Sequence, residues 1–335
     1  MKKRFLSLAL VFAMVLAFVP LDAVAVDEFN IQYEKLISYN GSGGPVVIPD
    51  GVVEIGDRAF DGKKSVSSIT IPSSVTTIGN NAFRGCTGLQ NISIPNSVVS
   101  MGEGLFSGCT GLRSATLPND MTIMPEKTFS GCTALTDIAI PSGVTTIAAY
   151  AFYNCKGLTN LIVPNSVTVL GGYAFQYCSG LTSVTISNNV TTIFTHTFAS
   201  CSSLTSVIIP FSVTKIDIYA FDACSKLTSI TIPSSVTTID GTAFRLTPRS
   251  LTIFGESGSY AETYAAKNDI SFFAITFAPN LGTANSWARD GIQQAFDKDF
   301  IPSGIQSSYT SVITRAEFCL MAVKWVEYAT STSYA

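Results

Sequence analysis

The stretch Leu227–Phe244, LTSITIPSSVTTIDGTAF, contains the pattern that decides the fold. The pattern recurs every 23 residues. A strict period of about 20 to 29 residues with an L-x-x-I-x-I core is typical of a stacked solenoid, in which each repeat buries its apolar side chains against the neighbouring repeats. We therefore predict a β-rich, right-handed stack of about nine coils with short parallel strands. The period is 23 residues, and it is kept by the phenylalanines Phe60, Phe83, Phe106, Phe129, Phe152, Phe175, Phe198, Phe221 and Phe244.

Each repeat predicts a strand, a corner and a second extended side. In residues 89–111, LQNISIPNSVVSMGEGLFSGCTG, the residues Leu89, Ile92 and Ile94 fit a strand whose alternate side chains face inward. A V-x-x-I/M segment then supplies two more inward residues. Proline marks the corner because it donates no backbone hydrogen bond, and Ser187 is the one exception. The prolines are Pro49, Pro72, Pro95, Pro118, Pro141, Pro164, Pro210 and Pro233.

Cysteine recurs with the same period, while Cys319 stands apart. Equivalent positions in neighbouring coils lie about 4.8 Å apart with parallel Cβ directions, which is longer than the Cβ separation that a disulfide prefers. We therefore interpret the cysteines as a structural ladder of buried, reduced thiols. No C-x-x-C pair is present and His196 is the only histidine, so we expect neither a metal site nor a cofactor. The ladder comprises Cys86, Cys109, Cys132, Cys155, Cys178, Cys201 and Cys224.

The first 25 residues have the organisation of a secretory signal peptide. A basic start precedes an apolar run from Phe5 to Val19, and Ala23 and Ala25 frame a cleavage point. A membrane anchor is the alternative, but fifteen residues are fewer than the roughly 20 that a helix needs to cross a bilayer. We expect export with cleavage, and no membrane span in the mature chain.

The composition argues against nucleic acid and anionic membranes as partners. Only 13% of the residues are charged, 47% are hydrophobic, and the formal net charge is −3. Removing the leader, with Lys2, Lys3, Arg4 and Asp22, takes away +2 and leaves −5. A chain without a basic surplus has no electrostatic footprint for binding polyanions.

Both ends of the repeat region have the features of caps, which a solenoid needs to cover its terminal hydrophobic layers. Residues 26–48 show a looser alternating pattern and then enter the first repeat. From Arg245 the period lapses, and residues 259–268 are predicted to form a short helix. Lys63 and Thr247 replace the cysteine in the first and last turns. The capped solenoid is therefore expected to span residues 26–275.

The full pattern, L-T-x-I-x-I-P-x-x-V-T-x-I-x-x-x-A-F-x-x-C, resembles the BspA-like leucine-rich repeats of bacterial surface proteins over about residues 45–275. The resemblance implies a leucine-rich-repeat solenoid, a surface location and binding to host proteins or other cells. It attaches no enzymatic activity to the repeat.

The carboxyl end changes to a helical period. Residues 276–284 predict a linker, and residues 285–335 predict two amphipathic helices around a loop. Trp287 and the segment ITRAEF at 313–318 resemble an S-layer homology module. This resemblance implies attachment to a cell-wall polymer, with Trp287 and Arg315 as candidate contacts.

A structural interpretation of the same motif also stands. Thr314 and Glu317 have the spacing of a capping box, which satisfies backbone N–H groups at a helix start. A capping box does not require Arg315, which could pair with an anionic wall glycan. Such modules commonly occur in sets of three, and this chain has one.

Ring side chains form the clearest candidate binding surface. The position two before the repeated phenylalanine carries a ring in four consecutive repeats, and two more tyrosines lie close by. Aromatic rings suit protein or sugar partners, although stacking that merely shields the coil is the alternative. The outward strand positions, which are mostly Ser, Thr or Asn but are interrupted by Ile162 and Ile208, form a weaker candidate. The ring residues are Tyr150, Tyr173, His196, Tyr219, Tyr153 and Tyr177.

These observations predict a secreted binding or adhesion protein at the cell surface or cell wall. Its expected partners are a host or bacterial surface protein or a glycan, with cell-wall polymer as a further partner of the carboxyl module. A structural S-layer or envelope component is the alternative. A wall-acting enzyme is a distant third, because His196 and Cys201 form the only candidate dyad and Cys201 occupies a repeated structural position.

Overall fold

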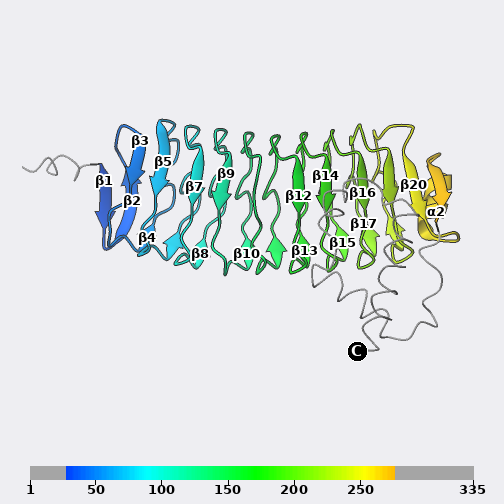
Figure 1. The fold of residues 1–335 in the computed structure, drawn as a ribbon, viewed down its shortest axis with the longest axis horizontal. Helices are drawn as coiled ribbons and strands as arrows, with labels where there is room; N and C mark the ends of the chain where they lie inside the picture. The colour runs from blue at the N-terminus through cyan, green and yellow to red at the C-terminus, as the bar shows by residue number, and fades with distance from the viewer. Residues whose placement is uncertain (1–27, 276–335) are drawn as a thin grey trace, which may run out of the picture. The chain divides into compact units, whose positions relative to one another are not determined.

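The computed structural model describes residues 28–275, which form a parallel β-solenoid (Figure 1). The predicted fold class is confirmed. We number the coils by their phenylalanines, from coil 1 with Phe60 to coil 9 with Phe244. The expected leader, linker and carboxyl helical module lie outside the described residues, and so does Cys319.

The first side of the coil is built from the predicted L-x-x-I-x-I strands, drawn as the upper row in Figure 1. Neighbouring strands pair in parallel one repeat apart, as in Ile92 opposite Ala115. Alternate residues face the core, so Ile92 is buried while Asn91 and Ser93 are exposed. Coil 5 has only an isolated bridge between Ser114 and Asp137 on this side, and β21 (Ser271–Ala274) of the carboxyl cap continues the row by pairing with β20. The other strands are β3 (Gly44–Val47), β5 (Val66–Thr70), β7 (Asn91–Ser93), β9 (Ser114–Thr116), β12 (Asn160–Ile162), β14 (Ser183–Thr185), β16 (Ser206–Ile208), β18 (Ser229–Thr231) and β20 (Thr252–Gly255).

The second side follows the proline corner and consists of two-residue strands from the V-x-x-I/M segments. These strands also pair in parallel, for example Ile55 opposite Ile78. The A-F-x-x-C segment closes the third side. The second-side strands are β4 (Glu54–Ile55), β6 (Thr77–Ile78), β8 (Ser100–Met101), β10 (Ile123–Met124), β11 (Thr146–Ile147), β13 (Val169–Leu170), β15 (Thr192–Ile193), β17 (Lys215–Ile216) and β19 (Thr238–Ile239).

An antiparallel hairpin covers the amino-terminal end of the stack. Strand β1 (Phe29–Gln32) pairs with β2 (Lys35–Tyr39), and β2 continues in parallel onto β4. The turn residues Tyr33 and Glu34 have φ values of 50° and 63°. Glycine or asparagine is the usual signal for such a turn, and the sequence places neither here. The hairpin was therefore not predicted.

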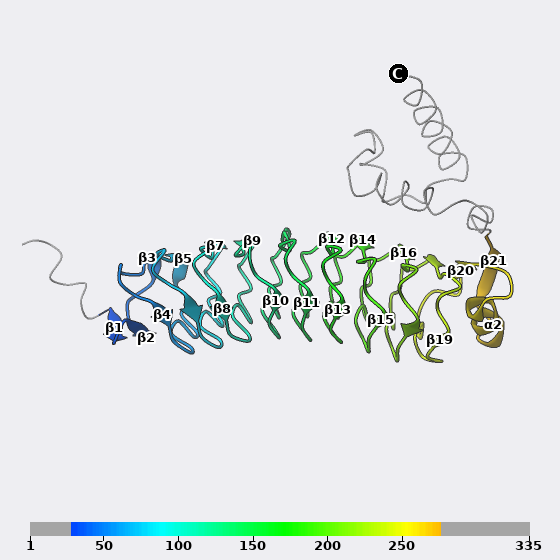
Figure 2. The same cartoon turned by 90° about the horizontal axis from the view of Figure 1, so that it is seen from below.

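A helix covers the other end, as Figure 2 shows in the turned view. Helix α2 (Tyr260–Lys267) confirms the predicted helix, and Ser259 is its N-cap, with its side chain accepting from the Glu262 N–H. The Glu262 carboxylate in turn accepts from the Gly258 N–H at 2.6 Å. Tyr264 is buried and meets the ring of Phe244 edge-on at 5.9 Å.

The repeated phenylalanines stack into one column along the core. Neighbouring ring centroids lie between 5.3 and 5.6 Å apart, and all nine rings are buried. Tyr39 extends this column at the amino end, 5.1 Å from Phe60, and Tyr264 closes it at the other end. Aromatic residues from the two caps therefore continue the column of rings, although they do not keep the 23-residue period.

The seven cysteines of the ladder are buried and carry free thiols. Each Sγ donates to the carbonyl oxygen of the phenylalanine in the preceding coil, at 3.0–3.2 Å. Thr247, which replaces the cysteine in coil 9, instead donates to Phe244 within its own coil at 2.7 Å. The thiols thus bridge coils, and the bridging ends where the repeat ends.

Ser187, the exception among the corner prolines, compensates for a second change nearby. In several coils a serine two residues after the corner proline donates to a valine carbonyl one coil back, as Ser166 does to Val144. Coil 7 has Asn189 at that position. The buried Ser187 hydroxyl donates to Val167 O at 2.6 Å and so replaces the missing bond.

Candidate binding surface

The four predicted rings form a second stack at the start of the A-F-x-x-C segment. We call Tyr150, Tyr173, His196 and Tyr219 the ring column. Successive ring centroids lie 4.7, 4.7 and 4.9 Å apart; the first two contacts are nearly parallel and the third is tilted by 54°. The residues are half-buried. The column therefore repeats the spacing of the coils at the surface.

The backbone of the ring column is left-handed, which sequence reasoning missed. All four residues have φ between 55° and 62°. An ordinary L-residue adopts this conformation at a cost of roughly 1–2 kcal/mol, which glycine avoids and asparagine reduces. The available signal was the same position in coils 2 and 3, occupied by Asn81 and Gly104. Coils 5–8 carry rings at this position, and coils 1 and 4 carry Arg58 and Lys127, so glycine or asparagine is favoured here by the backbone but is not required.

Cations close both ends of the ring column. The Lys127 ammonium lies 5.8 Å from the centroid of the Tyr150 ring, and the Arg245 guanidinium lies 4.9 Å from that of Tyr219. Arg245 is held by Asp222 through two hydrogen bonds of 2.9 and 3.1 Å, which raise the pKa of the guanidinium. Because the ring faces contact one another or a cation, a partner meets mainly ring edges and hydroxyl groups.

The other two predicted tyrosines join the same surface. Tyr153 meets Tyr150 edge-on at 5.7 Å and Tyr177 at 5.4 Å. Tyr177 is 42% exposed and has a left-handed backbone, with φ of 63°. Its position forms a second left-handed series, which glycine occupies in coils 1–4. The structure thus brings all six predicted ring residues together.

The polar groups of the ring column are uncommitted. The hydroxyls of Tyr150, Tyr173 and Tyr219 make no hydrogen bond to any residue between 28 and 275. Nδ1 of His196 is buried and also lacks a partner among these residues. Burial lowers the pKa of His196. The charge of Asp222 acts against this shift, and the charge of Arg245 lowers the pKa further. The column therefore presents a neutral edge of hydroxyl groups, and Nδ1 of His196 lies buried beneath that edge.

The outward strand face offers fewer free groups. Several of its polar side chains bond one another between coils, as in Ser114 to Asn91 at 2.8 Å and Ser183 to Asn160 at 2.6 Å. Ile162 and Ile208 are 73% and 67% exposed and interrupt this face, as predicted. Because much of its hydrogen-bonding capacity is used internally, this face is the weaker candidate.

Charge divides the solenoid into two regions. From Ile138 to Thr214, Lys156 is the single charged residue. The equally long stretch before it contains ten: Asp61, Lys63, Lys64, Arg84, Glu103, Arg113, Asp120, Glu126, Lys127 and Asp137. Three of the four rings of the column lie in the stretch with the single charge, and Tyr219 lies just beyond it.

The candidate dyad of Cys201 and His196 lacks a reactive thiol. Cys201 is buried and donates to Phe175 O at 3.2 Å, and burial raises the pKa of its thiol well above the usual value. A nucleophilic cysteine needs the opposite shift. Between residues 28 and 275 there is also no group of three or more His, Cys, Asp or Glu side chains that could hold a metal ion.

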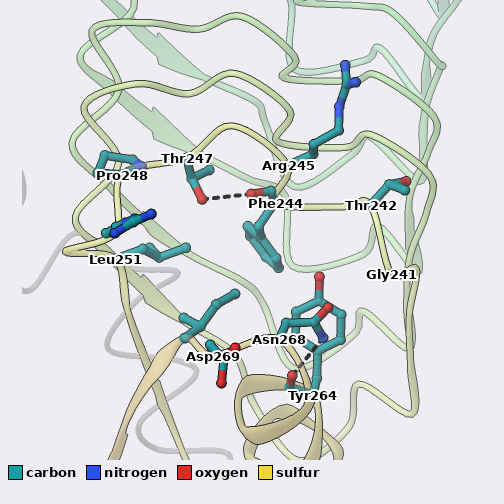
Figure 3. A pocket seen from close by; sticks show the side chains of 12 residues that line it. Gly241, Thr242, Phe244, Arg245, Thr247, Pro248, Leu251, Tyr264, Asn268 and Asp269 are labelled. Atoms are coloured by element: carbon teal, nitrogen blue, oxygen red, sulfur yellow. Dashed lines mark hydrogen bonds between the residues drawn. The ribbon is translucent and has the colours of Figure 1, made fainter.

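A small cavity lies between coil 9 and the carboxyl cap (Figure 3). Its volume is about 280 Å³, and its lining includes Phe244, Thr247 and Tyr264. Figure 3 shows the Arg245 side chain directed away from Tyr264, and burial raises the Tyr264 pKa to about 12. The cavity therefore lies at the junction between the last repeat and the cap, and no residue of the ring column lines it.

Two further results concern the predicted location. No helix in the described part of the chain is long and apolar enough to cross a membrane. The candidate wall contacts Trp287 and Arg315 fall outside the described residues.

Comparison with known proteins gives a family match and several similar structures. The profile of the BspA type leucine rich repeat region matches residues 39–157 and 122–252. A leucine rich cell surface protein from Faecalibacterium prausnitzii is 26% identical, with 74% of this chain and 96% of that chain covered and a TM-score of 0.37. The leucine rich repeat protein of T. pallidum is 28% identical, with coverage of 60% and 89% and a TM-score of 0.42. Among curated proteins, none matches the chain.

Proposed function

We propose that this chain, which belongs to the BspA-type leucine-rich repeat family, is a secreted, surface-associated binding protein that acts in adhesion and catalyses no reaction. Its contact surface is the aromatic region of coils 5–8, and its partner is a surface protein or an uncharged glycan. The proposed leader, residues 1–25, directs export. The proposed carboxyl module, with Trp287 and Arg315, holds a cell-wall polymer.

One observation carries this proposal: the ring column occupies a left-handed position in four consecutive coils. The position accepts glycine and asparagine at lower backbone cost, and coils 2 and 3 have them. The core is complete without these side chains, because the buried phenylalanine column runs separately through the coil. Rings placed at a conformational cost, with free hydroxyls at the surface, are typical of a recognition site.

A binding screen tests the proposal. The full chain is immobilised and presented with host matrix proteins, bacterial surface proteins and uncharged glycans. A triple variant, Tyr150→Asn, Tyr173→Asn and Tyr219→Asn, is presented in parallel. Asparagine is chosen because Asn81 adopts the same backbone conformation in coil 2, with φ of 55°. We expect a saturable partner whose binding the triple variant loses.

The control is a variant of the outward strand face, Ser93→Ala with Thr116→Ala, which leaves the ring column intact. Its binding should equal that of the unchanged chain. Full binding by the triple variant, with circular dichroism showing both variants folded, would contradict the role of the ring column. Retention of the chain on purified cell walls, compared with Arg315→Ala, tests the wall contact separately.

A further inference from the structure

We infer that the ring column is a contact between two copies of this chain, which meet with their solenoid axes antiparallel. This inference rests on the proposed function, because it names the partner of the same surface. It assigns the column a homophilic role, in which chains on one surface or on two facing surfaces pair through coils 5–8.

The distribution of charge favours a second copy. A two-fold contact places each patch against an identical patch, so any uncompensated charge near the axis meets its own like charge. Ile138–Thr214 contains only Lys156, and the charge of Arg245 is compensated by Asp222. Two copies can therefore approach through coils 5–7 without the repulsion that the charged coils 1–4 would cause.

The repeat spacing fits the same partner. The ring column advances by 4.7–4.9 Å per coil, the distance between paired β-strands. A second solenoid has an identical axial period, so a contact made at one coil can recur at the next without accumulating mismatch. A partner with another period would meet the column at one or two coils only.

The order of the side chains selects the antiparallel arrangement. With the two-fold axis between coils 6 and 7, Tyr173 lies opposite His196 of the partner subunit and Tyr150 opposite the partner's Tyr219. A phenol hydroxyl can then donate to Nε2 of the neutral imidazole on both sides of the axis, because Nδ1 is the buried ring nitrogen. Lys127 meets the partner's Thr242 in this arrangement, whereas a parallel arrangement would place Lys127 against its own copy.

Exposed apolar side chains flank the column on the same coils. Tyr177, Phe194 and Ile218 are 42%, 39% and 38% exposed. In coil 2 the positions equivalent to Phe194 and Ile218 are Gly79 and Asn80, and Gly85 corresponds to Tyr177. Aromatic and aliphatic side chains around a neutral centre provide the burial that an interface needs.

Sedimentation equilibrium of the full chain tests the association. We expect a monomer–dimer equilibrium, and we expect Tyr173→Lys to lower the association constant at least about tenfold, since the substitution places like charges near the axis. The matched control is Asn81→Lys, at the same left-handed position in coil 2. Lys127, with φ of 55°, shows that lysine fits this position. The control should change association by less than about twofold.

Disulfide trapping tests the orientation in a Cys319→Ser background. Tyr150→Cys and Tyr219→Cys chains are mixed and treated with diamide. An antiparallel contact yields mainly mixed dimers of the two variants, and a parallel contact yields dimers of each variant alone. The seven ladder thiols are buried, so they do not interfere.

A chain that stays monomeric at all concentrations would overturn the inference, as would equal weakening by Tyr173→Lys and Asn81→Lys. Predominant dimers of each variant alone would overturn the antiparallel register. These failures are distinct from failure of the proposed function. A monomeric chain that binds a screened partner through the ring column retains the proposed function and loses the homophilic role.

Discussion

Coils 1–4 and coils 5–8 share one interior and differ at one turn. Phe83 and Phe175 occupy the same buried column, and Cys86 and Cys178 make the same bond to the coil before. At the left-handed position two before the phenylalanine, the first region carries Arg58, Asn81, Gly104 and Lys127, and the second carries the ring column. Within one fold, the repeated positions build the layers, and the positions that vary distinguish one region from the other.

The largest expected effect tests whether the two regions share one core. Phe83→Ala in coil 2 and Phe152→Ala in coil 5 each remove a fully buried ring that contacts the rings of both neighbouring coils. We expect each to reduce the free energy of unfolding by about 3–5 kcal/mol, because a cavity replaces the ring. Urea titrations followed by circular dichroism measure both.

The control for this pair is Val99→Ala, at an exposed position on the second side, which should shift stability little. A loss in coil 5 of less than half that in coil 2 would show that the aromatic region has a separate source of stability.

The interior was predictable because its residues recur. The period of 23, the corner prolines and the alternation of apolar residues predict the strands on both sides, and these are confirmed except in coil 5, where the first side has only an isolated bridge between Ser114 and Asp137. The helix at residues 260–267 was predictable from the lapse of the period and the serine at its start. Each of these features leaves a local trace in residue type.

The surface was predictable only in part. The sequence places the six rings in neighbouring coils, but their orientation depends on the left-handed backbone, which no aromatic residue signals. The contact of Arg245 with the end of the column could not be predicted either, because Asp222, which holds Arg245 in place, lies a full repeat away in the sequence. Side-chain geometry between coils depends on contacts that are distant in sequence, so the period alone could not supply it.

Substitutions in the cysteine ladder are expected to reduce stability by an intermediate amount. Cys86→Ala and Cys178→Ala, one in each region, remove a buried sulfur and its hydrogen bond to the preceding coil. We expect a loss of about 1–2 kcal/mol for each, measured by urea titration. Burial raises the pKa of both thiols to about 12.

The same thiols should therefore resist alkylation by iodoacetamide at neutral pH in the folded chain and react after unfolding, which mass spectrometry detects. Rapid labelling of Cys178 with slow labelling of Cys86 would show that the aromatic region opens more readily than the charged one.

Substitution of a ring in the ring column is expected to affect stability less than substitution of a ring in the core. Tyr173→Asn loses two ring contacts but adopts the left-handed backbone at lower cost. We expect these terms to offset each other, so the free energy of unfolding should change by less than about 1 kcal/mol. The matched change in the other region, Asn81→Tyr, adds a ring without ring neighbours and should destabilise more. A loss for Tyr173→Asn comparable to that for Phe152→Ala would identify the column as structural.

The smallest expected effect concerns the pH dependence of the aromatic region. His196 stacks between Tyr173 and Tyr219 and faces Asp222 and Arg245. Its pKa in the folded chain lies below the usual value of 6.5, chiefly because burial disfavours the charged imidazole. The unfolded chain therefore takes up a proton first as the pH falls, so the stabilisation is complete above 6.5 and is lost as the pH falls through the folded pKa.

The variant His196→Tyr isolates this contribution, since it continues the stack with a ring that does not titrate in this range. Urea midpoints of both chains are compared between about pH 8 and pH 5. We expect the midpoint of the unchanged chain to fall more steeply than that of the variant below pH 6.5, because the variant retains every carboxylate and lacks only the histidine. Parallel midpoints would mean that the imidazolium is accommodated between the two tyrosine rings, with cation–π attraction offsetting the cost of burial.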